Sequence, residues 1–353
     1  MTAPTCREVM GFNKFDNPIS LEFEMEFADF IDADRKVREF FVIENDGSLR
    51  GHAAELVSRP TMTPGRMGEA LVAVGNFFKQ SKATPSERCS THVHINVQEF
   101  TALQICTALC VYWYLEEAFL EYCDDDRRGN LFCLSVQDAG FFPDQISESV
   151  NRGQFWEEFR ARIWNNQRYG ALNLASIGKF GSLEFRALEG TTNLDKVDKW
   201  IKVCYDIIHG SKQFKSPAAF LDFAHGLDMK KVAHEVMGPN ASILKYDKLD
   251  NNADILLHFA YDTPWANLEK EEKKAPKKKK TATTRNREGE VMWQNLEVHQ
   301  NALNELRQRA GNPDWADQVM QVRVQAENEE AAAEIRGEEF DNIIFDDDIF
   351  GEV

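Results

Sequence analysis

Residues 21–27 read LEFEMEF, with apolar and acidic side chains in strict alternation. Because successive side chains of a β-strand point to opposite faces, this pattern predicts a strand with one apolar face and one acidic face. The acidic face carries Glu22, Glu24 and Glu26, about 6.6–6.8 Å apart. A solvent-exposed acidic face would explain the pattern. A bound divalent cation would also explain it, because it relieves the repulsion within a row of carboxylates.

Two further segments place polar side chains on one strand face. Residues 92–97, HVHINV, put His92, His94 and Asn96 together, and imidazole is a good ligand for zinc, manganese or iron. Residues 182–188, SLEFRAL, put Glu184 beside Arg186. A glutamate there can hold a metal while the arginine reaches a phosphate, although an ordinary ion pair would give the same spacing.

A third polar group lies around a turn between two short strand candidates, at 39–44 and 54–58. Asp46-Gly47 is typical of a hairpin turn. Glu55 opens an apolar strand, where an unpaired carboxylate would be costly, so a metal or a basic partner is expected for it. Arg168 precedes a strand candidate at 172–174 and by itself indicates only a surface residue.

Helical periodicity predicts helices over 67–79, 100–122, 155–165 and 193–209, with Asn193 as the N-cap of the last. The strands are spread between helices of varied length without regular βαβ spacing. This arrangement favours an α+β fold with an antiparallel sheet. Within a body spanning 1–265, residues 211–265 are expected to form a helical accessory part.

The composition changes after about residue 265. Residues 266–290 include EKEEKKAPKKKK at 269–280 and predict a charged linker. A helix is expected over 291–310. Residues 311–353 hold 13 Asp and Glu against two Arg, which predicts a disordered acidic tail. Its segment FDNIIFDDDIF, at 340–350, is typical of a docking motif for a protein partner, although a merely solubilising tail would also fit.

The whole chain has 41 Lys and Arg against 58 Asp and Glu, a formal net charge of −17. This balance argues against a nucleic-acid or membrane-surface partner, since both are polyanions. The seven cysteines form no Cys-x-x-Cys pair, so buried reduced thiols are expected. With no signal peptide and no membrane-length apolar run, we expect a cytoplasmic protein.

The order of these segments resembles that of a known family. The strand glutamates are followed by DGSL (46–49), ELVSRP (55–60), CSTHVHIN (89–96), RYGALNL (168–174) and GSLEFRALEGT (181–191). This series is similar to the amidoligase family of the glutamine synthetase-like carboxylate–amine ligase superfamily. The resemblance covers about residues 18–210, and its most specific parts are STHVHIN and LEFR.

The resemblance implies a fold and a reaction. The fold would be a strongly curved antiparallel sheet, glutamine synthetase-like, with helices packed on its convex side. The reaction would join a carboxylate to an amine with ATP and Mg²⁺ or Mn²⁺, through an acyl phosphate. Many relatives are thought to act on peptides, proteins or cell-wall material, and similar genes occur in phages. Relatives often assemble, so the resemblance also implies self-association.

The resemblance also assigns roles to single residues. The positions matching metal ligands are Glu22, Glu24, Glu55, His92 and Glu184. The positions matching the nucleotide site are His94, Asn96 and Arg186. Arg186 would also steady the transferred phosphate, Arg168 would contact a second phosphate or the substrate, and Asp46 would orient or deprotonate the attacking amine.

Two other function classes stay open. The chain could keep this fold as a non-catalytic binding or assembly protein, with the acidic tail as its docking element. It could also be a metal-dependent hydrolase that uses the same carboxylates and histidines. The nucleotide separates the three hypotheses, because a ligase needs ATP, a hydrolase acts with metal alone, and a scaffold does neither.

Overall fold

The computed structural model describes residues 3–13, 17–29, 33, 35–45, 49–60, 62–139, 141–161, 169–246 and 252–268. The chain divides into two compact units, Met1–Gln294 and Asn295–Val353, and every described residue lies in the first. The helix predicted at 291–310 and the acidic tail at 311–353 therefore lie outside the described residues. The charged linker predicted at 266–290 also does, apart from 266–268.

A six-stranded sheet in the order β2-β3-β1-β4-β6-β5 forms the centre of the first unit. All five strand pairings are antiparallel, so the predicted α+β class with an antiparallel sheet is confirmed. The strands are β1 (Ile19–Phe27), β2 (Phe41–Glu44), β3 (His52–Ser58), β4 (Thr91–Asn96), β5 (Leu172–Asn173) and β6 (Ser182–Phe185).

The segment LEFEMEF forms most of β1, the strand between β3 and β4. Burial alternates along it as the sequence predicts: Leu21, Phe23 and Met25 are fully buried. The opposite face is not freely solvated, because the side chains of Glu22 and Glu24 are only 18% and 14% exposed. The acidic face of β1 is therefore covered by neighbouring groups.

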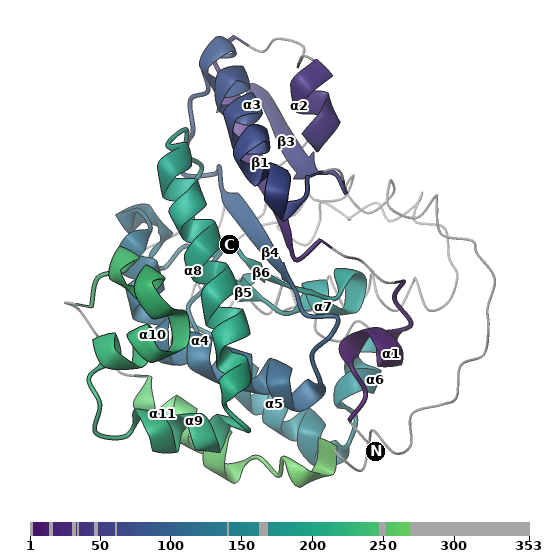
Figure 1. Ribbon diagram of the computed structural model, residues 1–353, viewed down its shortest axis with the longest axis vertical. Helices are drawn as coiled ribbons and strands as arrows, with labels where there is room; N and C mark the ends of the chain where they lie inside the picture. The colour runs from purple at the N-terminus through teal and green to yellow at the C-terminus, as the bar shows by residue number, and fades with distance from the viewer. Residues whose placement is uncertain are drawn as a thin grey trace, which may run out of the picture. The chain divides into compact units, whose positions relative to one another are not determined.

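Helices precede, separate and follow the strands along the chain, and several of them lie next to the sheet (Figure 1). They are α1 (Cys6–Met10), α2 (Arg35–Phe40), α3 (Met67–Gln80), α4 (Ala102–Tyr122), α5 (Phe141–Arg152), α6 (Phe155–Arg160), α7 (Ala175–Phe180), α8 (Leu194–Gly210), α9 (Pro217–Ala224), α10 (Met229–Met237) and α11 (Ala253–Leu257). Figure 1 shows α3 and α8 in front of the strands, while α9, α10 and α11 gather at the end of the unit near α4.

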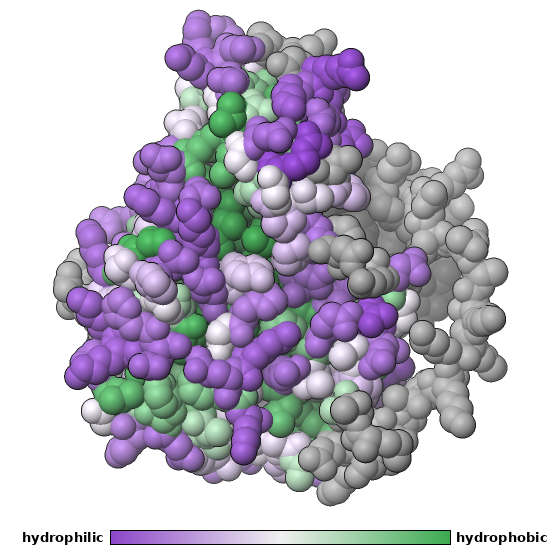
Figure 2. All heavy atoms as spheres, viewed as in Figure 1, coloured by the Kyte–Doolittle hydropathy of each residue, from purple (hydrophilic) through white to green (hydrophobic). Residues whose placement is uncertain are grey.

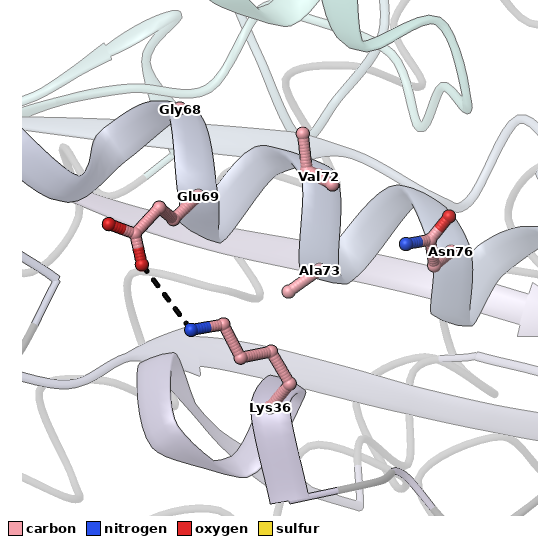
Figure 3. Close-up of a pocket in the computed structure, with 6 residues that line it drawn as sticks. All are labelled: Lys36, Gly68, Glu69, Val72, Ala73 and Asn76. Carbon is pink, nitrogen blue, oxygen red and sulfur yellow. Dashed lines mark hydrogen bonds and ion pairs between the residues drawn. The ribbon is translucent and has the colours of Figure 1, made fainter.

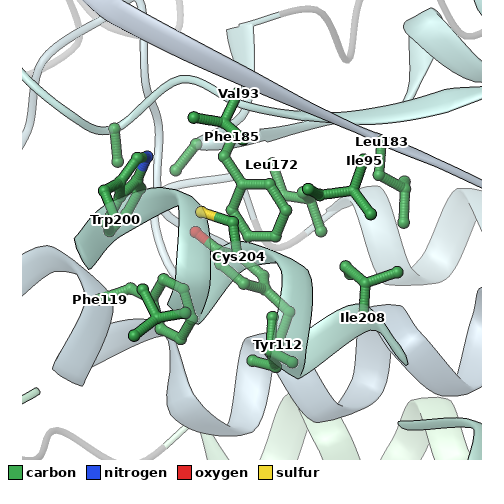
Figure 4. Close-up of a cluster of buried hydrophobic side chains, with 14 of the residues drawn as sticks. Val93, Ile95, Tyr112, Phe119, Leu172, Leu183, Phe185, Trp200, Cys204 and Ile208 are labelled. Atoms are coloured by element: carbon green, nitrogen blue, oxygen red, sulfur yellow. The ribbon is translucent and has the colours of Figure 1, made fainter. Parts of the chain in front are cut away.

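The apolar face of the sheet packs against α3, α4 and α8. The ring of Phe23 in β1 lies 5.6 Å from that of Phe78 in α3. On the same face, toward the β6 end of the sheet, the ring of Phe185 in β6 lies 5.4 Å from Tyr112 in α4 and 6.2 Å from Trp200 in α8 (Figure 4). Each such buried aromatic contributes about 1.5–3 kcal/mol. This packing leaves the polar side chains of the same strands on the opposite face.

Several predicted boundaries shift. Residues 39–40, expected in a strand, end α2 instead. The helix predicted at 155–165 ends at Arg160, and residues 162–165 lie outside the described part. The sequence pattern does not predict α7, a six-residue helix between β5 and β6 that ends at Gly181. Gly181 has a φ of 69°, which favours glycine. The Asn193 cap is confirmed, since its side chain accepts from the Lys196 backbone N–H.

All seven cysteines are buried free thiols, as predicted. Burial raises the pKa of the Cys6 thiol to about 12, which suppresses its reactivity. The surface in Figure 2 is largely hydrophilic, with hydrophobic side chains emerging around α9 and α11, where Leu257 is 48% exposed. None of the described helices combines the length and the apolar character that crossing a membrane requires.

Glu116 in α4 gives the fold a predicted pH dependence. It is 1% exposed, and its Oε2 accepts a hydrogen bond of 2.7 Å from the Val136 N–H. Burial raises its pKa from 4.5 to about 8, and the hydrogen bond offsets this only in part. Between these values the folded state holds a proton that the unfolded state has released, so the free energy of unfolding falls as pH rises.

We therefore expect Glu116→Gln to remove this slope. Glutamine keeps an acceptor for Val136 and has no proton to lose. Relative to wild type, the variant should gain roughly 2–4 kcal/mol in free energy of unfolding between pH 5 and pH 8. Urea unfolding at both pH values measures the difference. Parallel pH profiles for the two proteins would show that Glu116 does not titrate in this range.

Candidate functional site

The strand register brings the predicted polar residues into one row across the sheet. Glu22 on β1 is paired with His92 on β4. Two residues further along β4, His94 is paired with Glu184 on β6, and Glu184 is paired in turn with Asn173 on β5. Four strands distant in sequence thus supply side chains to one patch.

Glu22, His92, His94 and Glu184 form the carboxylate–histidine cluster. His92 Nδ1 lies 3.2 Å from Glu22 Oε2 and 3.4 Å from Glu184 Oε1. His94 Nε2 lies 3.2 Å from Glu22 Oε1 and 4.0 Å from Glu184 Oε2. The two histidines and Glu184 are at most 6% exposed. Both imidazoles therefore face both carboxylates.

The donor atoms of this cluster fit a divalent cation. One ligand atom each from Glu22, His94 and Glu184 lies within 4.8 Å of the others. Within the described part of the chain, the buried Nε2 of His94 makes no hydrogen bond, while its Nδ1 lies 3.1 Å from Ser182 Oγ. Two carboxylates and an imidazole suit Mg²⁺ or Mn²⁺.

His92 is held in a similar way, through the opposite ring nitrogen. Ser90 Oγ donates its single proton to Glu24 Oε2 and lies 2.7 Å from His92 Nε2. The hydroxyl can then only accept from His92, which places a proton on Nε2 and leaves Nδ1 as the ring nitrogen that faces Glu22 and Glu184. His92 is therefore also suited to bind a metal through Nδ1, and its predicted role as a ligand stays a prediction.

The charges in the cluster stabilise one another. Burial raises the pKa of Glu22, but the charge of His94 and the hydrogen bond from His92 outweigh it and hold that pKa well below 4.5. Burial also raises the pKa of Glu184, and the charges of Arg186 and the two histidines bring it below its usual value. Burial lowers the pKa of His94, but Glu22 and Glu184 raise it more. Both carboxylates are therefore anionic at neutral pH, as metal ligands must be.

Arg186, just beyond β6, supplies the cation of the site. Its Nη1 lies 2.6 Å from Glu184 Oε1, and its Nε donates to the Phe132 carbonyl at 3.4 Å. Burial lowers the pKa of Arg186, but Glu184, Glu24 and Glu22 raise it by more than burial lowers it, so the guanidinium stays charged. A fixed guanidinium beside a metal-binding carboxylate can also bind a phosphate.

The remaining predicted residues lie around the cluster. Glu24 is paired with Glu55 on β3, and Glu55 is 5% exposed and paired with Glu44 on β2. These carboxylates extend the row toward β2. Asn96 follows His94 on the same face. Its Nδ2 donates to the Asn17 carbonyl at 3.2 Å, and its Oδ1 accepts from the Gln98 N–H at 2.9 Å.

Two predicted catalytic residues, Asp46 and Arg168, lie outside the described residues. Their predicted roles, in amine activation and in contact with a phosphate or the substrate, stay predictions.

The structure adds three supporting residues that the sequence analysis missed: Ser90, Asn173 and Ser182. Asn173 Oδ1 accepts from the Ala175 N–H at 2.8 Å, which turns its Nδ2 toward Glu184 Oε2, 2.6 Å away. The period-two rule could have found Ser90 and Ser182, since each lies two residues before a cluster residue. Asn173 could be found only from the pairing of β5 with β6.

A separate groove lies away from this cluster, between α2 and α3 (Figure 3). It has a volume of about 490 Å³. Val72, 65% exposed, lines it, together with Lys36 and Glu69, which form an ion pair of 3.3 Å. No residue of the carboxylate–histidine cluster lines this groove.

Comparison with known families gives an independent assignment. Residues 44–208 match the model of a family described as "Putative amidoligase enzyme". This segment, just under half of the chain, is similar to the amidoligase family. The matched amidoligase segment includes Glu55, both histidines, Glu184 and Arg186, while Glu22 and Glu24 precede it. The assignment indicates a ligase. No curated protein matches the chain.

Proposed function

We propose that the protein is an ATP- and divalent-metal-dependent ligase that joins a carboxylate to an amine through an acyl phosphate. The observation that carries the proposal is the position of Glu22, His94 and Glu184 beside Arg186, three of them within an amidoligase segment. We further propose that the antiparallel sheet is of the curved, glutamine synthetase-like type.

The chemistry explains why such a set of residues is needed. A carboxylate is a poor electrophile, so its oxygen first takes the γ-phosphoryl group and releases ADP. The amine then attacks the acyl carbon, loses a proton, and phosphate leaves. A divalent cation held by Glu22, His94, Glu184 and His92 would supply charge neutralisation for the phosphates. Arg186 binds the transferred phosphoryl group, and Glu184 orients Arg186.

We propose roles for the other predicted residues as well. Glu24 and Glu55 would hold a second cation toward β3. Asn96 lies beyond His94 and would contact the nucleotide. Asp46 would receive the proton of the amine, and Arg168 would contact a phosphate or the substrate. A peptide or protein is the substrate class we propose, as the source of both a carboxylate and an amine.

Calorimetry with ATP tests the proposal, in the presence and absence of Mg²⁺ or Mn²⁺. We expect ATP to bind only with metal. Glu26→Gln provides a matched control for a cluster variant such as Glu184→Gln. Glu26 lies on the same face of β1 as Glu22, but it accepts a hydrogen bond from the Arg50 N–H and is not part of the cluster. A protein that binds metal and not ATP would favour the hydrolase alternative, and one that binds neither would favour a non-catalytic binding protein.

Removal of residues 281–353 should leave metal-dependent ATP binding unchanged. All the residues that we assign to the site lie between Glu22 and Arg186. We propose that the acidic tail instead contacts a protein partner, and that its loss weakens this contact. Calorimetry on the truncated chain provides the measurement. Loss of ATP binding on truncation would place the tail in the active unit.

A further inference from the structure

An exposed aromatic ring lies beside the carboxylate–histidine cluster. Phe180, at the end of α7, is 48% exposed. Its ring lies 5.9 Å from the His94 imidazole, nearly perpendicular to it at 87°. The other large apolar side chains exposed in the described part of the chain, such as Val72 and Leu257, have no such contact with the cluster. A half-exposed aromatic ring in contact with a buried polar cluster offers an apolar surface to a ligand bound there.

The ring is held in place by its backbone. The Phe180 carbonyl accepts a hydrogen bond of 3.0 Å from Gln98 Nε2, which ties α7 to the end of β4. The next residue, Gly181, has left-handed backbone geometry, and a Cβ there would lie 2.5 Å from the Gln98 side chain and 3.1 Å from the Phe12 ring. The chain can turn into β6 here only with glycine. The backbone that carries the Phe180 ring is therefore fixed beside the site.

A cation accompanies the ring. Lys179 Nζ lies 4.7 Å from the centre of the Phe180 ring. The row of polar residues is thus asymmetric, with Glu24, Glu55 and Glu44 toward β2 and an aromatic ring with an ammonium at the β4–β6 end. A ligand with a flat π system joined to an anionic group matches that end.

We propose that Phe180 is the platform on which the adenine base of the nucleotide stacks, with Lys179 beside it and the phosphates directed toward the cluster. This inference rests on the proposed function, because the base that stacks belongs to the ATP proposed there. Phe180 would distinguish a nucleotide from a bare polyphosphate, which has no base. Stacking on an aromatic ring needs only the π-face of the base. The cluster binds the phosphates through metal, and Phe180 adds affinity for the base.

Calorimetry with two ligands separates these contributions: ATP and inorganic tripolyphosphate, each with Mg²⁺. Phe180→Ala should weaken ATP binding about tenfold and leave tripolyphosphate binding unchanged. Phe180→Trp should keep or improve ATP binding. It should also report binding by quenched tryptophan fluorescence with ATP and not with tripolyphosphate. Val72→Ala truncates an exposed apolar side chain of α3 and should change neither affinity.

The outcomes distinguish this inference from the proposed function. If the wild-type protein binds neither ligand, both are overturned. If the wild-type protein binds ATP and Phe180→Ala binds it equally well, only the stacking role is overturned. If Phe180→Ala loses ATP and tripolyphosphate in parallel, the ring supports the metal cluster and does not bind the base. Unquenched fluorescence of the Phe180→Trp variant with bound ATP would also contradict the inference.

Discussion

Glu184→Gln should lose Mn²⁺ binding by about 100-fold or more at neutral pH. Removing an outer-shell partner of a metal ligand typically costs about 10- to 100-fold in affinity, and loss of an anionic ligand should cost at least as much. Glutamine has the shape of glutamate but offers one neutral oxygen. Electron paramagnetic resonance of free Mn²⁺ in a titration measures the affinity directly, without knowledge of the ligase substrates.

The control for this experiment is Glu26→Gln, which makes the same chemical change on β1, at a residue outside the cluster. It should bind Mn²⁺ as the wild type does. Wild-type Mn²⁺ affinity in Glu184→Gln would show that Glu184 is not a metal ligand. Glu24 and Glu55, which are paired across β1 and β3, would then be the next candidate ligands.

The substitution should also destabilise the fold. Glu184 Oε1 bonds Arg186 and Oε2 bonds Asn173, each at 2.6 Å, and its side chain is 6% exposed. Breaking a buried ion pair by removing one partner costs about 3–5 kcal/mol. Circular dichroism must therefore show that Glu184→Gln is folded at the temperature of the Mn²⁺ titration, so that lost binding reports on the site.

The main features of the fold could be predicted from the sequence because β1 and β4 alternate so clearly. A period of two decides both the secondary structure and which side chains share a face. For this reason Glu22, His92, His94 and Glu184 could all be placed on strand faces before the strands were paired. The pairing itself comes from long-range packing, such as Phe23 of β1 on Phe78 of α3, which local pattern does not specify.

Details within the site depended on three-dimensional contacts. His92 and His94 share a face, so the sequence gives no physical reason to assign one to metal and the other to nucleotide. In the structure both face Glu22 and Glu184, and each is oriented by a different serine. Asn173 was missed because only the pairing of β5 with β6 places it beside Glu184. Phe180 was missed because it lies in α7, a helix too short to show a clear period in the sequence.

Arg186→Met should reduce phosphate release from ATP by about 10³-fold or more, the range seen when an arginine that stabilises a transferred phosphoryl group is removed. Methionine fills much of the volume but has no charge and no donors. Arg186→Lys keeps the charge without the fork of donors, so it should recover only part of the activity. A colorimetric phosphate assay with Mg²⁺, ATP, and peptides that supply the carboxylate and the amine measures the loss.

Metal binding gives a second readout for Arg186, with a definite sign. Apart from burial, which raises it, Arg186 is the largest influence on the pKa of Glu184, and it lowers that pKa. Without Arg186 the pKa of Glu184 rises, so protons compete with the metal at higher pH than in wild type. Mn²⁺ affinity of Arg186→Met should therefore be weaker than wild type at acidic pH. At alkaline pH it should equal or exceed wild type, because the competing guanidinium is gone. An unchanged pH profile together with full phosphate release would mean that Arg186 neither tunes Glu184 nor binds the phosphoryl group.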